Sequence, residues 1–308
     1  ISMADATVLQ TAGGNIRVNG GGLVTIGVVD ARTASDRLGS TIAGQASWGA
    51  VSLTGLGIAD NDTESVANSV DVFASSLRIN ATAGAGTSIN ALETEVVLIS
   101  ANTGTGSFFV TESTAIDIGE TAAIVANRVL QSGVTSTSST TDSIQSDVVS
   151  GSLLVLTTLA GSITVHEGDI DVGTLGARAA GNLLLQAGGA SADLIIEARI
   201  LSNAGSISLL AGRDILQGAN VVASSAGTTI EQVAGRDVLQ AQGVATTNAG
   251  GNIALTAARN VVIETISAGT GNVSVIATSG SITDGDIAGD TEVDITGAGV
   301  KLTAAGGI

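Results

Sequence analysis

The chain of 308 residues has no cysteine, proline or tyrosine, and only one tryptophan and three phenylalanines. Without cysteine it can form neither a disulfide framework nor a thiolate metal site. Without proline its turns depend on Asn, Asp, Ser, Thr and the 42 glycines. Because aromatic residues normally fill irregular spaces in a core, their scarcity indicates a narrow, regular interior of Val, Ile, Leu and Ala. No capped segment of helical period stands out, so we expect an all-β chain.

Basic residues are scarce as well. Eleven Lys and Arg face 28 Asp and Glu, which gives a net charge of −17. Such a field repels phosphate backbones and anionic membrane surfaces, so we expect no nucleic-acid partner. No apolar run approaches the ~18 residues that span a bilayer, so we expect no membrane insertion. Strong acidity favours solubility and attracts divalent cations.

A short phrase recurs between residues 161 and 282: a glycine, a small polar residue, and then alternating apolar positions. Its glycines are Gly161, Gly181, Gly205, Gly227, Gly251 and Gly271, spaced by 20, 24, 22, 24 and 20 residues. A second phrase, Ala-Gly-Arg-Asp-Ile/Val-Leu-Gln, starts at Ala211 and Ala234, and a variant starts at Ala257. Fixed periods in the twenties are typical of solenoids, in which each repeat buries its apolar face against its neighbours.

Three short strands fit into one repeat of about 22 residues. In the repeat that starts at Gly205 they are 206–210, 214–217 and 220–223, each alternating apolar and polar residues. Three strands without a helix between them predict a parallel β-helix of triangular section. About fourteen coils, at the ~4.8 Å strand spacing, predict a rod of about 65 Å. Glycines at the corners would permit positive φ. Asparagines at matching positions would stack as an amide ladder: Asn15, Asn182, Asn252 and Asn272.

We interpret residues 1–308 as one continuous solenoid segment, most regular over 151–308. Irregular coils with larger loops are expected near 31–70, and a protruding polar loop near 131–150. Trp48 falls in the first of these stretches, where a lone tryptophan most often covers the edge of a core. The chain begins at Ile1 and ends in what reads as the start of another repeat, so we expect a piece of a longer repetitive protein.

The Gly-Asn-Ile-x-Leu phrase followed by Ala-Gly-Arg-Asp-Ile/Val resembles the repeats of filamentous-haemagglutinin-type proteins and other giant bacterial surface adhesins. The runs Ile1–Asp5 and Asn90–Thr94 also resemble very long β-strand-repeat exoproteins. The resemblance covers most of the chain and is best over 151–308. It implies a right-handed β-helix, and a location outside the cell or on the bacterial surface. The implied partners are neighbouring coils of the same giant chain, like chains in a filament, or the surface of a host or neighbouring cell.

Three functions follow from these observations. The first is a structural rod that holds adhesive or assembly elements away from the cell. The second is direct adhesion through the loops near 31–70 and 131–150. The third, a β-helix polysaccharide lyase or hydrolase, is disfavoured because basic residues are scattered and sugar-stacking aromatics are nearly absent. We therefore expect no enzymatic activity and no catalytic residue.

His166, the only histidine, has Glu167 and Asp169 beside it. It could be a general base held by a carboxylate, but a solvated turn residue after strand 163–165 is the preferred interpretation. The pairs Arg213-Asp214 and Arg236-Asp237 should stack on neighbouring coils as an exposed charge ladder, worth about 0.5 kcal/mol per pair.

Acidic clusters are the candidate metal sites. They are Asp60, Asp62 and Glu64; Asp284, Asp286 and Asp290; and Asp169 with Asp171. Carboxylate oxygens suit calcium, the one cofactor that the sequence brings into question. No cluster matches an EF-hand loop or a Gly-Gly-x-Gly-x-Asp repeat, so solvated surface charge is the preferred alternative.

Overall fold

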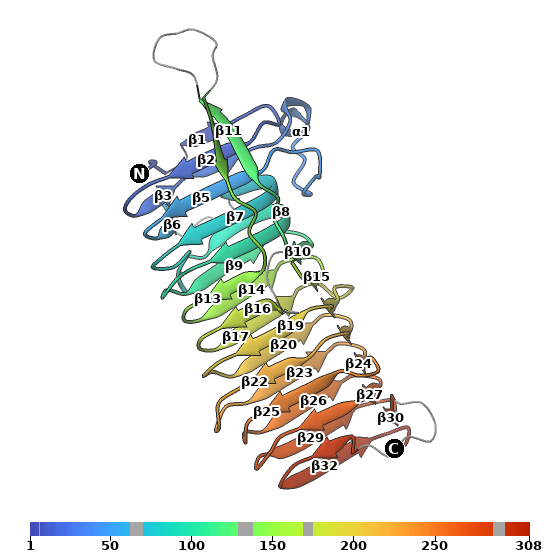
Figure 1. Cartoon of the computed structure of the whole chain (residues 1–308). Coiled ribbons are helices and arrows are strands. Elements are labelled where there is room, and N and C mark those ends of the chain that lie inside the picture. The colour runs from blue at the N-terminus through green and yellow to red at the C-terminus, as the bar shows by residue number, and fades with distance from the viewer. Residues whose placement is uncertain (6, 62–69, 129–137, 169–174, 286–292) are drawn as a thin grey trace.

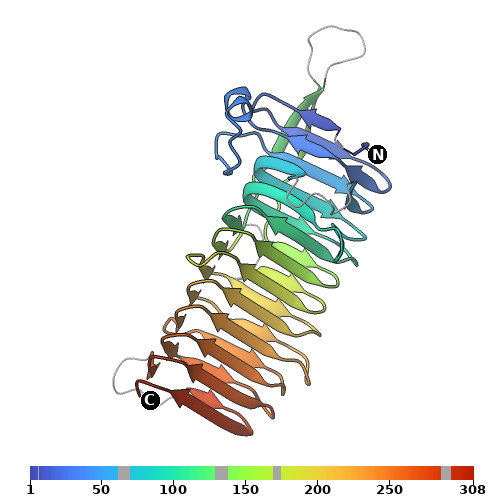
Figure 2. The same cartoon turned by 180° about the vertical axis from the view of Figure 1, so that it is seen from behind.

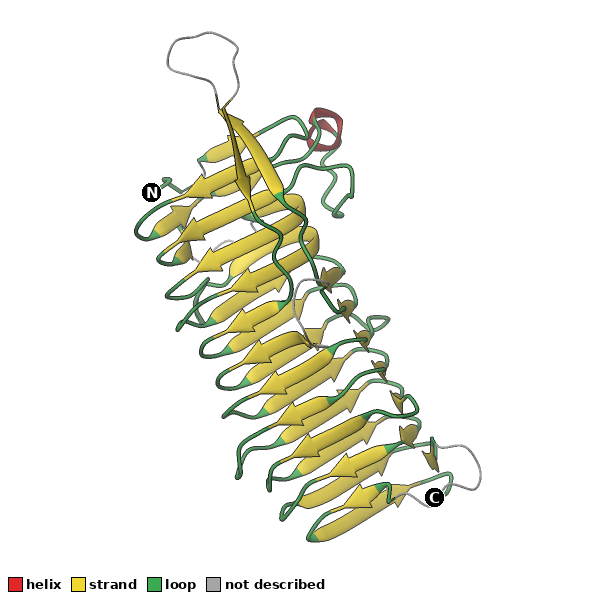
Figure 3. Cartoon of the chain, in the orientation of Figure 1, coloured by secondary structure: helices red, strands yellow, loops and turns green. Residues whose placement is uncertain are grey.

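The computed structural model describes residues 1–5, 7–61, 70–128, 138–168, 175–285 and 293–308. The chain winds from end to end as a solenoid whose strands stack in parallel (Figures 1 and 2). Strands dominate, and the described residues contain one short helix, α1 (Ala34–Leu38) (Figure 3). The predicted all-β, parallel β-helical fold is confirmed. No helix among these residues is long and apolar enough to cross a bilayer.

The strands form three columns. The first contains β3 (Val24–Ile26), β6 (Ile58–Asp60), β9 (Phe108–Glu112), β14 (Leu154–Thr158), β17 (Leu183–Ala187), β20 (Ile207–Ala211), β23 (Ile230–Ala234), β26 (Ile253–Ala257), β29 (Asn272–Ala277) and β32 (Gly299–Ala304). The second contains β1 (Val8–Gln10), β4 (Val28–Asp30), β10 (Ile116–Ile118), β15 (Ile163–Val165), β18 (Leu194–Ile196), β21 (Ile215–Gln217), β24 (Val238–Gln240), β27 (Val261–Ile263) and β30 (Ile282–Asp284).

The third column contains β2 (Ile16–Asn19), β5 (Val51–Gly55), β13 (Val148–Ser150), β16 (Leu175–Ala179), β19 (Arg199–Ser202), β22 (Val221–Ala223), β25 (Ala245–Asn248), β28 (Thr265–Ser267) and β31 (Ile295–Thr296). Two long strands, β7 (Val72–Ala81) and β8 (Leu92–Asn102), belong to the second and third columns at once, because their two halves pair with strands of different columns. The first residues of β8 also pair with β9 of the first column. The predicted strands of the Gly205 repeat match β20, β21 and β22 to within one residue.

Alternating residues of each strand face the interior and stack in register. One such row begins at Val24 and ends at Val300, passing through Ile58, Ala85, Phe108, Leu154, Leu183, Ile207, Ile230, Ile253 and Val273. Those eleven residues are separated by ten steps, which at ~4.8 Å each span about 48 Å. The expected fourteen coils and 65 Å are therefore too many and too long.

The recurring glycines differ in what requires them: Gly227 has the expected positive φ, at 78°, with open space around it, whereas Gly205 is required by close packing. A Cβ on Gly205 would lie 2.2 Å from the backbone nitrogen of Asn182 in the preceding coil. The asparagines beside these glycines are exposed, and their side-chain oxygens accept backbone N–H groups of the next coil; Asn182 accepts from Ser206. Only Asn252 and Asn272 form the expected amide-to-amide contact, at 3.4 Å.

Two insertions explain why the solenoid has fewer coils than the length of the chain predicts. Residues 33–48, with α1, leave the solenoid after β4 and return to it before β5. Between β10 and β13, the strands β11 (Ile124–Arg128) and β12 (Ser138–Asp142) form an antiparallel hairpin that lies back over the N-terminal coils (Figure 1). The expected loop at 131–150 is thus wrong in part, because its described residues contain β12 and the solenoid strand β13.

The hairpin is held on the solenoid by polar contacts. Arg17 of β2 donates from Nε to Asp142 at 2.8 Å, and Asn15 donates its amide to the Val125 carbonyl at 3.0 Å. Both contacts join residues more than 100 positions apart in the sequence. No repeat of the chain encodes such a contact, so pattern analysis could not place it.

Candidate functional site

Of the predicted calcium ligands, the structure describes only Asp60 and Asp284. Asp62, Glu64, Asp286 and Asp290 lie outside the described residues, as do Asp169 and Asp171. Asp284 is exposed at the end of β30. Asp60 is 6% exposed at the end of β6, and it is joined by two acidic residues that sequence analysis did not select.

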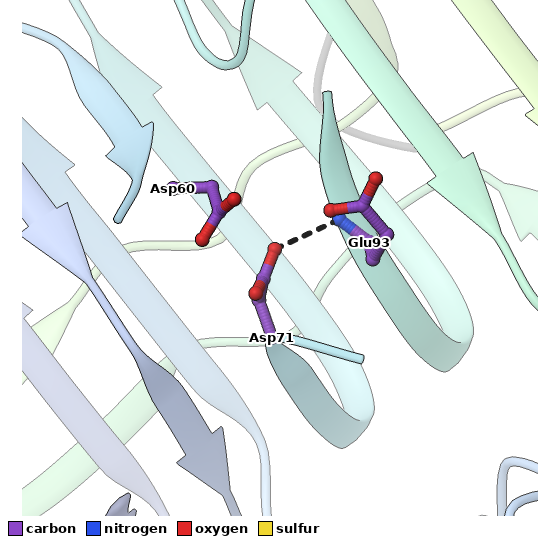
Figure 4. Close-up of side chains that lie close together, drawn as sticks. All are labelled: Asp60, Asp71 and Glu93. Carbon is purple, nitrogen blue, oxygen red and sulfur yellow. Dashed lines mark hydrogen bonds between the residues drawn. The ribbon is translucent and has the colours of Figure 1, made fainter. Parts of the chain in front are cut away.

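Asp60, Asp71 and Glu93 form a three-carboxylate cluster in the N-terminal coils (Figure 4). One carboxylate oxygen of each lies within 4.8 Å of the others. Glu93 donates its backbone N–H to Asp71 Oδ2 at 2.9 Å, and Asp71 donates its own N–H to the Glu93 carbonyl at 2.8 Å. Asp71 and Glu93 are 22 residues apart, one period of the solenoid. That spacing was the signal in the sequence that could have identified the pair.

Burial controls the charge of this cluster. Asp71 is 2% exposed, and burial raises its pKa to about 10, with the neighbouring Asp60 and Glu93 charges acting in the same direction. The hydrogen bond from Glu93 N–H opposes the shift without cancelling it. The cluster must therefore take up a proton at neutral pH or be neutralised by a cation. Its three carboxylates would supply three of the six to eight oxygens that calcium requires.

A second pair of buried carboxyls, Glu95 and Glu112, lies nearby on β8 and β9. Both side chains are fully buried, and burial raises the pKa of Glu95 and places that of Glu112 well above its usual range. Thr94 donates its hydroxyl to Glu112 at 2.7 Å. Thr114 contacts both, because its hydroxyl donates to Glu95 at 2.6 Å and its N–H to Glu112 at 3.3 Å.

His166 follows β15 at the surface and is 41% exposed. Its Nδ1 lies 2.8 Å from a carboxylate oxygen of Glu197, and its Nε2 lies 3.7 Å from Asp117. These partners come from the coils above and below, and Asp169 lies outside the described residues. The imidazole is therefore held between two carboxylates at a corner, a more ordered environment than the solvated turn that we preferred.

The Arg-Asp motif forms a ladder, but its pairing differs from the prediction. Each arginine forks onto the aspartate of the preceding coil: Arg213 onto Asp193, Arg236 onto Asp214 and Arg259 onto Asp237. The aspartates are buried while the arginines are 41–52% exposed.

Each aspartate of the ladder also accepts a backbone N–H from the next coil, as Asp214 does from Asp237 at 3.2 Å. Hydrogen bonds from the arginines lower the pKa of Asp193 and Asp237. In the last of these coils Gly280 stands where the earlier coils have an arginine. The aspartate position below it is occupied by Asn260, which is uncharged and accepts the backbone N–H of Ser281. The ladder is therefore an intercoil clamp, stronger than the exposed charge pairs that we expected.

Comparison of the chain with protein-family models, with curated proteins and with solved structures gave no match.

Proposed function

We propose that this chain is a rigid spacer segment of a large secreted or cell-surface bacterial protein that acts in adhesion or in the formation of surface fibres. The observation that carries the proposal is the unbroken row from Val24 to Val300, stacked in parallel register at every step and buried up to its exposed last residue. The resemblance of the repeats to filamentous-haemagglutinin-type proteins supports the bacterial surface as its location.

The rod is expected to be rigid because bending it would break contacts between successive coils. Each coil is joined to the next by parallel hydrogen-bond ladders on three faces and by a continuous aliphatic core. In the C-terminal half, the Arg-Asp forks join successive coils at one corner as well. Bending the rod must stretch these contacts on one side, and protease cleavage must open them, so a stiff and resistant rod is expected.

The partners of such a rod are neighbouring coils of the parent chain, like chains in a filament, or another cell's surface. A net charge of −17 disfavours nucleic acid as a partner. Electron microscopy of the purified segment, with calcium and with a chelator, tests the proposal. Separate straight rods of about 50 Å support a spacer, whereas ordered fibres assign the segment itself to filament formation. Flexible or collapsed particles would contradict the proposal.

Direct adhesion is a second candidate, favoured by the segment 33–48. Two large apolar side chains on it face solvent, Leu38 at 88% and Ile42 at 57% exposure. Exposed apolar residues on an anchored protrusion are suited to contact another protein. The double substitution Leu38→Ser and Ile42→Ser should abolish attachment to target cells under this alternative. Leu159→Ser, at a 50% exposed corner position, is the matched control.

A further inference from the structure

The two insertions cover two of the three strand columns near the N-terminal end of the rod. The insertion 33–48 lies on the second column, where Gly44 donates its backbone N–H to Oε1 of Glu95 at 2.5 Å. The hairpin lies on the third column, where Nε of Arg78 donates to the Ser143 carbonyl at 3.1 Å. In the described part of the chain, the first column continues from β9 to β32 as an open sheet face.

The outer face of the first column is almost free of charge. Two residues of each of the eight strands from β9 to β32 point outward, in rows that run from Phe109 to Lys301 and from Thr111 to Thr303. Glu231 and Lys301 are the only charged residues in the two rows, and their charges are opposite. Half of the uncharged positions are apolar, and nearly all the others are Ser or Thr. The face therefore differs from the chain as a whole, whose net charge is −17.

The size of this face is that of a protein interface. Five-residue strands at ~3.3 Å per residue give a width of about 17 Å, and seven steps of ~4.8 Å give a length of about 34 Å. Each copy could bury about 550 Å², or about 1,100 Å² for a pair, against the ~1,000 Å² that a specific interface requires. Since two copies repel each other through their net charge of −17, an uncharged face is where they approach with least repulsion.

We propose that two copies of this chain pair side by side through their first-column faces, antiparallel and related by a two-fold axis between β20 and β23. The pairing rests on the rod of the proposed function and identifies its partner as a like chain. An axis along the strands reverses the rod and places each outward row on the same row of the partner. At the axis, Leu210 of β20 meets the partner's Val233, and Val233 of β23 meets the partner's Leu210. The centre of the interface is therefore apolar, as is usual in specific complexes.

On either side of the axis, larger side chains meet smaller ones. Leu184 of β17 faces the partner's Ala254, and Val155 of β14 faces the partner's Ser274. Because the two-fold axis repeats each contact, the same two fits occur again at the other end of the interface. A face that opposes large and small side chains in this way packs without gaps.

The two charged residues of the face also meet suitable groups. Lys301 faces the partner's Phe109, and a cation over an aromatic ring is a favourable contact. Glu231 faces the partner's Ser208, whose hydroxyl can donate to the carboxylate. A parallel pair would instead place Glu231 over the partner's Val233, with its charge against an apolar side chain. The antiparallel arrangement is therefore the one that matches the face to itself.

Sedimentation velocity of the purified chain, from micromolar to several hundred micromolar, tests the pairing. We expect a dimer that dissociates on dilution. Leu210→Asp places two carboxylates at the apolar centre and should weaken dimerisation at least about tenfold. Leu216→Asp, at an outward-facing position of the second column in the same coil, is the matched control and should dimerise as the unmodified chain does. A chain that stays monomeric throughout, or a control that is weakened equally, would overturn the proposal.

A pair of cysteines tests the antiparallel arrangement and does not depend on the folding of Leu210→Asp. The chain has no cysteine, and Val155 and Ser274 lie five strands apart within one copy, about 24 Å. The double variant Val155→Cys with Ser274→Cys should therefore oxidise to a covalent dimer. Neither single variant should do so, because its two thiols would lie at least about 24 Å apart in the pair. No covalent dimer from the double variant, or equal yields from the single variants, would refute the proposed axis.

Electron microscopy of the same samples separates this proposal from the proposed function. Rods that lie in side-by-side pairs support the pairing. Single straight rods refute the pairing and leave the spacer intact, whereas collapsed particles contradict the spacer and the pairing together.

Discussion

The strongest quantitative prediction concerns Asp71. Its pKa is about 10 in the folded chain, against a reference value of 3.8. A raised pKa contributes stability that is fully present below pH 3.8 and is lost as the pH rises toward 10. Between these limits folding takes up one proton at this group, so the free energy of unfolding falls by about 1.4 kcal/mol per pH unit. From pH 6 to pH 8 the loss is about 2.7 kcal/mol, a large fraction of a typical domain's stability.

The perturbation is Asp71→Asn, which keeps the size of the side chain and cannot ionise. Urea unfolding followed by circular dichroism at pH 6, 7 and 8 gives the slope of stability against pH for each chain. We expect the unmodified chain to lose stability across this range, with Glu112 adding to the slope because burial places its pKa well above the usual range. In Asp71→Asn the free energy of unfolding should fall less steeply with pH, by about 1.4 kcal/mol per pH unit, the contribution of one proton. Asp5→Asn, at an exposed position, is the control.

Equal slopes in the unmodified chain and in Asp71→Asn would refute this reasoning. A cation is the other means of neutralising the cluster, and it is tested in the same assay. If calcium binds to Asp60, Asp71 and Glu93, millimolar CaCl₂ should restore at pH 8 the stability that is lost above pH 6, and EDTA should remove it. Asp71→Asn should then lose the response to calcium. A chain that unfolds identically in CaCl₂ and in EDTA is neutralised by protons alone.

Three further predictions concern the rod itself, and thermal or urea unfolding checks each of them. Asp214→Ala removes the acceptor of the Arg236 fork and leaves the buried Asp237 N–H without its acceptor, which should cost about 1–3 kcal/mol; no loss would mean that the ladder does not stabilise the rod. Gly205→Ala should cost about 3 kcal/mol because its Cβ would lie 2.2 Å from the preceding coil, whereas Gly21→Ala, with open space around it, should be neutral. Gln232→Leu should stabilise by about 1 kcal/mol, since Oε1 of Gln232 is buried without a partner; destabilisation would show that its amide contacts matter more.

The architecture could be predicted because it depends on local pattern. The two-residue alternation of a strand and the 22-residue period of a coil determine which side chains face inward. The strands β20, β21 and β22 lie where the Gly205 repeat predicted them. The number of coils could not be predicted by dividing length by period. The insertion 33–48 and the hairpin use residues without adding a coil, and the hairpin contact of Arg17 with Asp142 joins residues 125 positions apart.

The acidic cluster of Asp60, Asp71 and Glu93 was likewise predicted only in part from the sequence. Asp60 was selected because acidic residues surround it in sequence, but its structural neighbours are Asp71 and Glu93. Stacking brings together residues one period apart, as it does Asp71 and Glu93, so the sequence period identifies that pair, while Asp62 and Glu64 lie outside the described residues. The Arg-Asp ladder also joins residues about one period apart. Arg213 binds Asp193, 20 residues earlier, more closely than the adjacent Asp214, whose carboxylate lies 3.5 Å from Nε of Arg213.

Polar residues at interior positions argue that the N-terminal coils have a role besides length. A row of aliphatic side chains is sufficient to make a rod. The C-terminal half also buries polar groups, among them the amide of Gln232, which bonds to Gln217 and Thr246, and the ladder aspartates, which pair with arginines. The N-terminal half instead buries Asp60 and Glu112 where a methyl-bearing side chain would pack. A buried carboxyl whose pKa is raised, as that of Glu112 is, lowers stability as the pH rises, so a chain that served only as a spacer would do better without one. Such departures from local consistency are expected where a site or a switch is built in. Asp60 and Glu112 lie in the half of the rod that carries the insertion 33–48 and the hairpin, and that half is where we expect the pH response and any contact with a partner other than a like chain to be found.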